Sequence, residues 1–130
     1  MCWVSKSKTM PIKNIAEKDI ICYEIFHIQN IIFDKWKIQK LYSEYMNFLY
    51  IPYKEQKYIN LKIENNISDK IITFGYHSYS TIERAIDEIY NSKYYTIVEC
   101  IIPKDSEYYI NSCQEIVSSN IIVTDKFFCF

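Results

Sequence analysis

The feature that most limits the fold is the close succession of extended segments in the last third of the chain. A near-continuous apolar run over residues 94–102 ends at Pro103, and shorter extended segments are predicted over residues 107–111, 115–117 and 120–125. No segment with helical periodicity separates them. Parallel neighbours need a crossover of a dozen or more residues, whereas antiparallel neighbours need only a turn. The pattern therefore predicts an antiparallel sheet.

Strands are also expected earlier in the chain. Residues 19–28 are dense in β-branched and aromatic side chains, residues 58–63 alternate between apolar and polar, and residues 69–76 have the composition of a more buried strand. The only glycine, Gly75, falls near the end of this last segment, where we expect a positive φ or a close approach to the backbone. Residues 1–18 lack a periodicity and contain Pro11, which predicts an irregular lead-in.

A first helix is predicted near residues 35–49. Apolar side chains from Ile38 to Leu49 follow the three- and four-residue spacing of one helical face. Asp34 is placed to cap the N-terminus, and Pro52 follows the end. Packing of this face on the domain's own sheet is the simpler interpretation, and binding of a partner helix is the alternative.

A second helix is predicted near residues 81–91 by a local sequence signal. The sequence Ser-Thr-Ile-Glu at positions 80–83 matches the capping box, in which the Ser80 hydroxyl accepts a hydrogen bond from the Glu83 amide. Apolar residues then recur with helical spacing at positions 82, 85, 86 and 89. The helix should therefore begin shortly after a strand.

The elements together predict an α+β fold. With 130 residues, of which 49% are hydrophobic, the chain has the size of a single compact domain with its own core. We expect this domain to cover residues 19–130, with a mixed, mainly antiparallel sheet and about two helices.

The composition is strongly biased. Isoleucine, lysine, tyrosine and asparagine make up 61 of the 130 residues, whereas glycine and arginine occur once each. The abundant residues have AT-rich codons, so we expect the source to be an AT-rich bacterium, a phage or a large virus. The bias weakens the argument that the tyrosines are there to stack on bases or sugars.

Charge and cysteine content exclude several classes of protein. The formal net charge of −1 gives no overall field that attracts nucleic acid or acidic membranes. The five cysteines lack a metal-ligand spacing, the first residues lack the pattern of a signal peptide, and no apolar run reaches the ~20 residues of a membrane span. We therefore expect a protein of the cytoplasm, bacterial or of a virus-infected host cell, with no metal, no nucleic-acid partner and no membrane.

The candidate ligand site lies at residues 76–80, where a strand meets the N-terminus of the second helix. Free amides and the positive end of the helix dipole bind phosphate or carboxylate at such a junction. Ser78 and Ser80 add hydroxyl donors, and His77 can donate or accept near neutral pH. Tyr76 and Tyr79 can stack on a base. The alternative is structural, because Ser80 is already a predicted cap and a single histidine beside a strand end often serves in local hydrogen bonding.

Two glutamates are further candidates. Glu115 enters a predicted strand after a polar loop, where a solvated surface position is the alternative. Glu99 lies inside the apolar run of residues 94–102, where an inward carboxylate would need a partner and an outward one would not.

A family resemblance rests on two of these segments. Residues 74–80, Phe-Gly-Tyr-His-Ser-Tyr-Ser, precede a predicted helix and resemble the F-x-S-T-S segment of ADP-ribosyltransferase-like domains. Glu115 and Ile116 are similar to the late catalytic glutamate strand of that family. The resemblance implies binding of NAD or a related nucleotide, with Glu115 as catalytic residue, Ser78 supporting it, and His27 or His77 holding the nucleotide.

The sequence departs from this family at two places. Tyr79 stands where the family has threonine, and Tyr23 and Glu24 stand where an arginine or histidine is common. These differences count against transferase activity more than against nucleotide binding. Residues 101–109 also resemble short uncharacterised proteins of gut bacteria and their phages, which implies no chemistry.

Three functions are compatible with the sequence. The first is a non-catalytic protein that binds a phosphate-bearing nucleotide or NAD-derived signal through residues 76–80 and His27, and that in a phage would sequester a host defence nucleotide. It requires no cofactor, and NAD or an NAD-derived nucleotide would be its ligand. The second is an ADP-ribosyltransferase-like enzyme. The third is a protein–protein interaction module whose tyrosines form a dimer face, which would make the chain a homo-oligomer.

Overall fold

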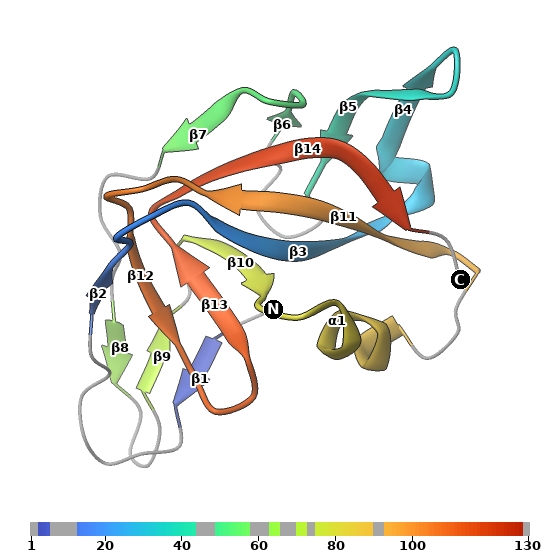
Figure 1. Cartoon of the computed structure of the whole chain (residues 1–130). Coiled ribbons are helices and arrows are strands. Elements are labelled where there is room, and N and C mark those ends of the chain that lie inside the picture. Colours follow the sequence, from blue (N-terminus) through green and yellow to red (C-terminus); the bar gives the residue numbers. More distant parts are fainter. Residues whose placement is uncertain are drawn as a thin grey trace.

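The computed structural model describes residues 3–5, 13–43, 49–57, 63–65, 70–72, 75–89 and 93–128 (Figure 1). Within these ranges the chain forms fourteen strands, one α-helix and one 3₁₀ turn. The strands are β1 (Trp3–Ser5), β2 (Asn14–Ile15), β3 (Ile20–His27), β4 (Ile31–Asp34), β5 (Lys37–Tyr42), β6 (Leu49–Tyr50), β7 (Glu55–Lys57), β8 (Ile63–Asn65), β9 (Lys70–Ile72), β10 (Tyr76–Tyr79), β11 (Tyr95–Ile102), β12 (Glu107–Ile110), β13 (Glu115–Ser118) and β14 (Asn120–Phe128). The helix is α1 (Ile82–Ile89), and the 3₁₀ turn is η1 (Ile28–Asn30).

Eight strands form the main sheet, in the order β2-β12-β13-β10-β3-β11-β14-β7. Its centre is the long pair of β3 and β11, which runs from Tyr95 opposite His27 to Ile102 opposite Ile20. All pairings of described residues in this sheet are antiparallel. The antiparallel sheet expected for the last third of the chain is therefore confirmed.

Two smaller sheets of three strands accompany the main sheet in the described part of the chain, in the orders β4-β5-β6 and β1-β9-β8. The predicted irregular lead-in at residues 1–18 contains β1 and β2, and β2 joins the edge of the main sheet. Of the predicted strand at 58–63, residues 58–62 lie outside the described residues. Gly75 directly precedes β10 and has a φ of 129°, which confirms the positive φ expected for it.

The predicted helix at residues 35–49 is wrong. Residues 31–34 and 37–42 instead form a β-hairpin, and residues 44–48 lie outside the described residues. In this hairpin Ile32 is opposite Lys40 and Phe33 is opposite Ile38, so that Gln39 is an extra residue in a β-bulge. The bulge lets Ile38 and Leu41 both point into the core although they are three residues apart. A bulged strand thus produces the same spacing of apolar residues as a helical face.

The second predicted helix is confirmed as α1, and residues 90–92 lie outside the described residues. Its N-cap differs from the expected one by one position. The Thr81 hydroxyl oxygen accepts a hydrogen bond from the Arg84 amide at 3.2 Å, so Thr81 caps the helix and not Ser80. Ser80 is held elsewhere, because its amide donates to the Gln114 carbonyl at 2.9 Å.

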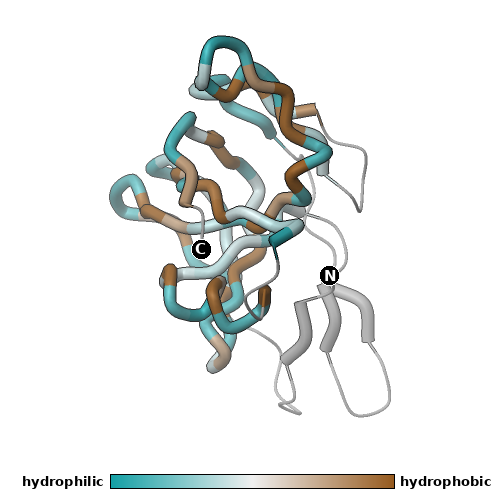
Figure 2. Tube along the Cα trace, turned by 90° about the vertical axis from the view of Figure 1, so that its right-hand side faces the viewer, coloured by the Kyte–Doolittle hydropathy of each residue, from teal (hydrophilic) through white to brown (hydrophobic). Residues whose placement is uncertain are grey.

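Among the described residues, two hydrophobic cores lie on the two faces of the main sheet. The first lies between this sheet and the β4-β5-β6 sheet and includes Cys22, Phe26, Ile31, Ile38, Leu41, Tyr50, Tyr76, Val98, Cys100, Ile102, Ile116, Ile121 and Val123. The second lies between the sheet and α1 and includes Tyr79, Ala85, Ile89 and Ile97. Along the tube in Figure 2, hydrophobic segments alternate with hydrophilic turns, as expected for strands that share a buried interior. The described fold is mostly sheet with one helix instead of the two expected, so helix is scarce for an α+β domain.

Candidate functional site

Strand β10 carries most of the predicted ligand residues, and it divides them between the two faces of the main sheet. Ser78 is opposite Ile116 and belongs with Tyr76 to the face of the first core. Tyr79 is opposite Glu115 and packs under α1 in the second core. Tyr76, Ser78 and Tyr79 are only 2–3% exposed. Residues 76–80 therefore do not form one continuous surface.

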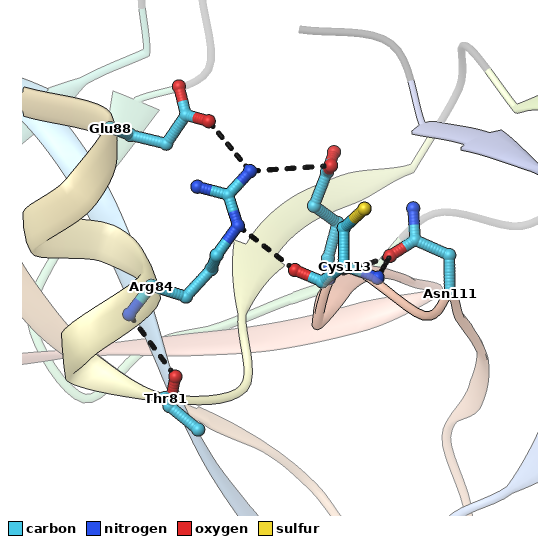
Figure 3. A network of polar contacts seen from close by, with 6 residues as sticks. Thr81, Arg84, Glu88, Asn111 and Cys113 are labelled. Carbon is cyan, nitrogen blue, oxygen red and sulfur yellow. Dashed lines mark hydrogen bonds and ion pairs between the residues drawn. The ribbon is translucent and has the colours of Figure 1, made fainter.

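On the helix side, Arg84 joins α1 to the turn between β12 and β13 (Figure 3). Its Nη2 lies 2.7 Å from Glu88 Oε1 and 3.8 Å from Glu115 Oε1, and its Nε donates to the Cys113 carbonyl at 3.0 Å. Its guanidinium lies 5.2 Å from the centre of the Tyr79 ring. The hydrogen bond to Glu88 raises the pKa of Arg84, although burial opposes this. We call Arg84, Tyr79, Glu88, Glu115 and Cys113 the Arg84 network.

The Arg84 network is a poor place for the phosphate expected at the start of the second helix. Glu88 and Glu115 already neutralise the guanidinium, and Glu83 lies in the first turn of α1. The Ser80 hydroxyl donates to Gln114 Oε1 at 2.6 Å, so both its amide and its hydroxyl are used within the protein. An anion here would meet several carboxylates around a single cation, which Coulomb repulsion disfavours.

His27 is the last residue of β3, whereas the contact between β3 and β10 is near the middle of that strand, at Tyr23. Its Nδ1 accepts a hydrogen bond from the Gln29 amide at 3.2 Å and caps η1, and its ring stacks on Tyr94 at 6.1 Å between centroids. Tyr23, which pairs with Tyr79, is four residues away, about 13 Å along an extended strand. The structure therefore does not bring His27 to residues 76–80, whereas His77 is in β10, half-buried and opposite Val117.

Glu115 is brought next to Tyr79 and Arg84, but not next to Ser78. Because Tyr79 and Glu115 are opposite each other on the helix side, Ser78 points to the other face of the sheet. The support of Glu115 by Ser78, which the family resemblance implies, is absent from this arrangement. Glu99, the other glutamate of interest, is half-buried, with its Oε2 3.7 Å from Lys126 Nζ.

On the face of the first core, Glu24 of β3 lies among other polar side chains. The sequence patterns did not predict a site at this position. The Tyr50 hydroxyl donates to Glu24 Oε1 at 3.4 Å, and the Cys100 thiol lies 3.9 Å from Oε2. The Tyr50 ring packs edge-on against Phe26 at 5.8 Å and against Tyr76 at 6.2 Å between centroids. The polar group is therefore bordered by aromatic rings.

Ser78 belongs to the same group. The antiparallel register that pairs Tyr79 with Tyr23 places Ser78 opposite Glu24 one residue along. The Ser78 Oγ is buried and has no hydrogen-bond partner among the residues that the structure describes. Buried hydroxyls are nearly always satisfied, so this one needs an explanation. We call Glu24, Tyr50, Ser78 and Cys100 the Glu24 cluster.

Burial keeps the Glu24 cluster uncharged. Part of Glu24 stays accessible to solvent, but protein atoms surround its carboxyl closely enough that burial raises its pKa to about 8, against the smaller opposite effect of the hydrogen bonds from Tyr50 and Cys100. Burial also raises the pKa of the Tyr50 phenol and of the Cys100 thiol. At neutral pH the Glu24 carboxyl is therefore mostly protonated and can both donate and accept hydrogen bonds.

The signal for this cluster was present in the sequence only in part. Alternation along β3 puts Glu24 on the same face as Cys22 and Phe26, both of which are buried. Its partners come from distant segments, since Tyr50 is 26 residues away and Cys100 is 76 residues away. The register of the sheet and the position of β6 decide which residues complete the cluster. Local sequence patterns predict neither of them.

Comparisons with protein-family models, with curated proteins and with solved structures give no match. In the described ranges, no three His, Cys, Asp or Glu side chains lie together in a way that could hold a metal ion. No helix in the described part of the chain is long and apolar enough to cross a bilayer. A function can therefore be inferred only from the geometry of the site.

Proposed function

We propose that this chain is a non-catalytic small-molecule-binding protein whose ligand is nucleotide-like and places its planar base against the Glu24 cluster. The single observation that carries the proposal is the buried Ser78 hydroxyl, which has no hydrogen-bond partner in the described part of the chain and lies opposite Glu24 in the sheet register. An unsatisfied buried hydroxyl costs about 1–3 kcal/mol. A bound group that hydrogen-bonds to Ser78 would recover that free energy.

The chemistry of the cluster favours a neutral, planar, polar group. A protonated carboxyl offers one donor and one acceptor, which matches the neighbouring donor and acceptor on the edge of a nucleobase. Ser78 offers a further hydroxyl, and the rings of Phe26 and Tyr76 border the cluster. Sites for small molecules commonly combine apolar and aromatic walls with a few placed polar groups.

The same chemistry disfavours a phosphate inside the cluster. None of the four members of the cluster is a cation that could pair with a phosphate. The negative charge of a phosphate would be buried beside the Glu24 carboxyl without a counter-charge. The phosphate or ribose of a nucleotide would therefore remain outside the cluster, toward the accessible part of Glu24.

The test is thermal and chemical denaturation with adenosine, guanosine, cytidine, uridine, NAD and ADP-ribose as probes. A genuine ligand stabilises the folded protein by about 2.7 kcal/mol at a hundredfold excess over Kd. Ser78→Ala should abolish that stabilisation. Ser106→Ala is the matched control, because Ser106 is also buried and its hydroxyl has no partner among the described residues, but it lies in the connection between β11 and β12.

Two outcomes would overturn the proposal. One is that none of the probes stabilises the protein, which would leave a water molecule as the partner of Ser78. The other is that a probe stabilises Ser78→Ala as strongly as the unmodified chain. Release of nicotinamide from NAD, abolished by Glu115→Gln, would instead support the ADP-ribosyltransferase-like enzyme.

A further inference from the structure

The turn between β4 and β5 presents a tryptophan at its tip. Lys35 and Trp36 occupy the two central positions, with positive φ values of 49° and 70°. Asparagine and glycine are preferred in such two-residue turns because bulky side chains are strained there. Trp36 is nevertheless present and is 94% exposed. In Figure 1 the loop that joins β4 and β5 projects from the upper part of the molecule.

The surface around this tip is apolar and locally basic. Ile32, Phe33 and Phe127 are exposed, and the rings of Phe33 and Phe127 are 5.5 Å apart between centroids. The hairpin itself carries one aspartate, Asp34, and three lysines, Lys35, Lys37 and Lys40. Its net charge is therefore positive beside the exposed rings, whereas Lys126 of β14 is paired with Glu99. We call Ile32, Phe33, Trp36 and Phe127 with Lys35, Lys37 and Lys40 the hairpin patch.

The charge of the hairpin patch indicates which partner it fits. A second copy of the chain docking by the same patch would bring lysine against lysine, which disfavours a symmetric dimer. Single-stranded nucleic acid needs open ring faces along a basic groove, whereas Phe33 and Phe127 pack against each other. An interface between water and anionic headgroups accepts a projecting tryptophan and attracts flanking lysines at the same time.

We propose that the hairpin patch binds the surface of an anionic phospholipid bilayer, with Trp36 entering the interfacial region and Lys35 and Lys37 contacting lipid phosphates. The net charge of −1 does not oppose this binding, because charges more than about 8 Å away are largely screened at physiological ionic strength. The inference is independent of the ligand proposed for the Glu24 cluster.

Tryptophan fluorescence with lipid vesicles tests this proposal. The chain has two tryptophans, so Trp3→Phe leaves Trp36 as the only emitter. Vesicles of phosphatidylcholine mixed equally with phosphatidylserine should shift its emission to shorter wavelength and carry the protein into the vesicle pellet, and vesicles of phosphatidylcholine alone should not. Trp36→Ala and Lys35→Glu should each weaken binding at least tenfold. Binding of Trp36→Ala is measured by pelleting, because this variant lacks the emitting side chain. Tyr94→Ala, which removes an exposed aromatic ring elsewhere, should not.

Three results would overturn the proposal. The first is equal pelleting, or none, with the two vesicle compositions. The second is an emission change caused by a single-stranded oligonucleotide and not by vesicles, which would assign the patch to nucleic acid. The third is self-association that Trp36→Ala abolishes while vesicles have no effect, which would assign it to a second copy. Circular dichroism of each variant separates loss of binding from loss of folding.

Discussion

The ionisation of Glu24 should make the stability of this domain depend on pH, and Glu24→Gln should remove that dependence. Burial raises the pKa of Glu24 to about 8 from an ordinary value of 4.5. Between these two values the folded protein keeps the proton and the unfolded chain has lost it, so the free energy of unfolding falls as pH rises. The stabilisation is complete below about pH 4.5 and is lost once the pH passes about 8.

The magnitude follows from the shift. One pKa unit corresponds to about 1.4 kcal/mol, which sets an upper limit of about 5 kcal/mol for the whole interval. Part of Glu24 remains accessible to solvent, which reduces the cost of its charge, so we expect about 2–4 kcal/mol. A neutral glutamine has nearly the same shape and cannot ionise. Relative to the unmodified chain, Glu24→Gln should therefore gain stability as the pH rises from about 5 to about 8.

Urea denaturation at a series of pH values measures this difference directly. Titrations shared by both proteins cancel when their free energies of unfolding are subtracted, and Glu24 remains. Gln39→Ala is the control, because Gln39 is exposed in β5 and neither glutamine nor alanine ionises, so its difference should not change with pH. A difference for Glu24→Gln that is also constant with pH, or a variant that loses stability as the pH rises, would show that burial does not raise the pKa of Glu24.

Three further variants test the cap of α1, the turn between β4 and β5, and the hydrogen bond from Tyr50 to Glu24. Thr81→Ala should destabilise the protein by about 1 kcal/mol and reduce its helical circular dichroism. Ser80→Ala should have a smaller effect on both. A larger effect of Ser80→Ala would favour the capping box expected from the sequence. Trp36→Gly should raise the free energy of unfolding in urea by about 1 kcal/mol, because glycine accepts a φ of 70° without strain. A loss of stability would contradict the positive φ at residue 36. Tyr50→Phe should raise the pKa of Glu24 further in a carboxyl NMR titration, because the hydrogen bond from Tyr50 lowers this pKa. A fall in the pKa of Glu24 would contradict the hydrogen bond.

The sequence predicted those parts of the fold that depend on local patterns. The apolar run that became β11, the short strands after it and helix α1 all have a periodicity that tertiary packing did not override. Residues 37–42 show where such patterns fail. The bulge at Gln39 spaces Ile38 and Leu41 as a helix would, and only the pairing with β4 distinguishes the two structures.

The candidate site was predictable to a smaller degree. The sequence located residues 76–80 at a strand-to-helix junction, which the structure contains as β10 and α1. It did not show that strand alternation would separate Ser78 from Tyr79, or that pairing in the sheet would place Ser78 beside Glu24. The long-range register of the sheet, which groups these side chains, leaves no local trace in the sequence.

The carbon-13 resonance of the Glu24 carboxyl, followed near neutral pH as each nucleoside is added, shows whether a ligand reaches the Glu24 cluster. We expect one nucleoside to move this resonance to a plateau in the unmodified chain and in Ser106→Ala, and to leave it unchanged in Ser78→Ala. A Glu24 resonance that stays fixed while that of Glu115 or Arg84 moves would place the ligand at the Arg84 network and not at the Glu24 cluster.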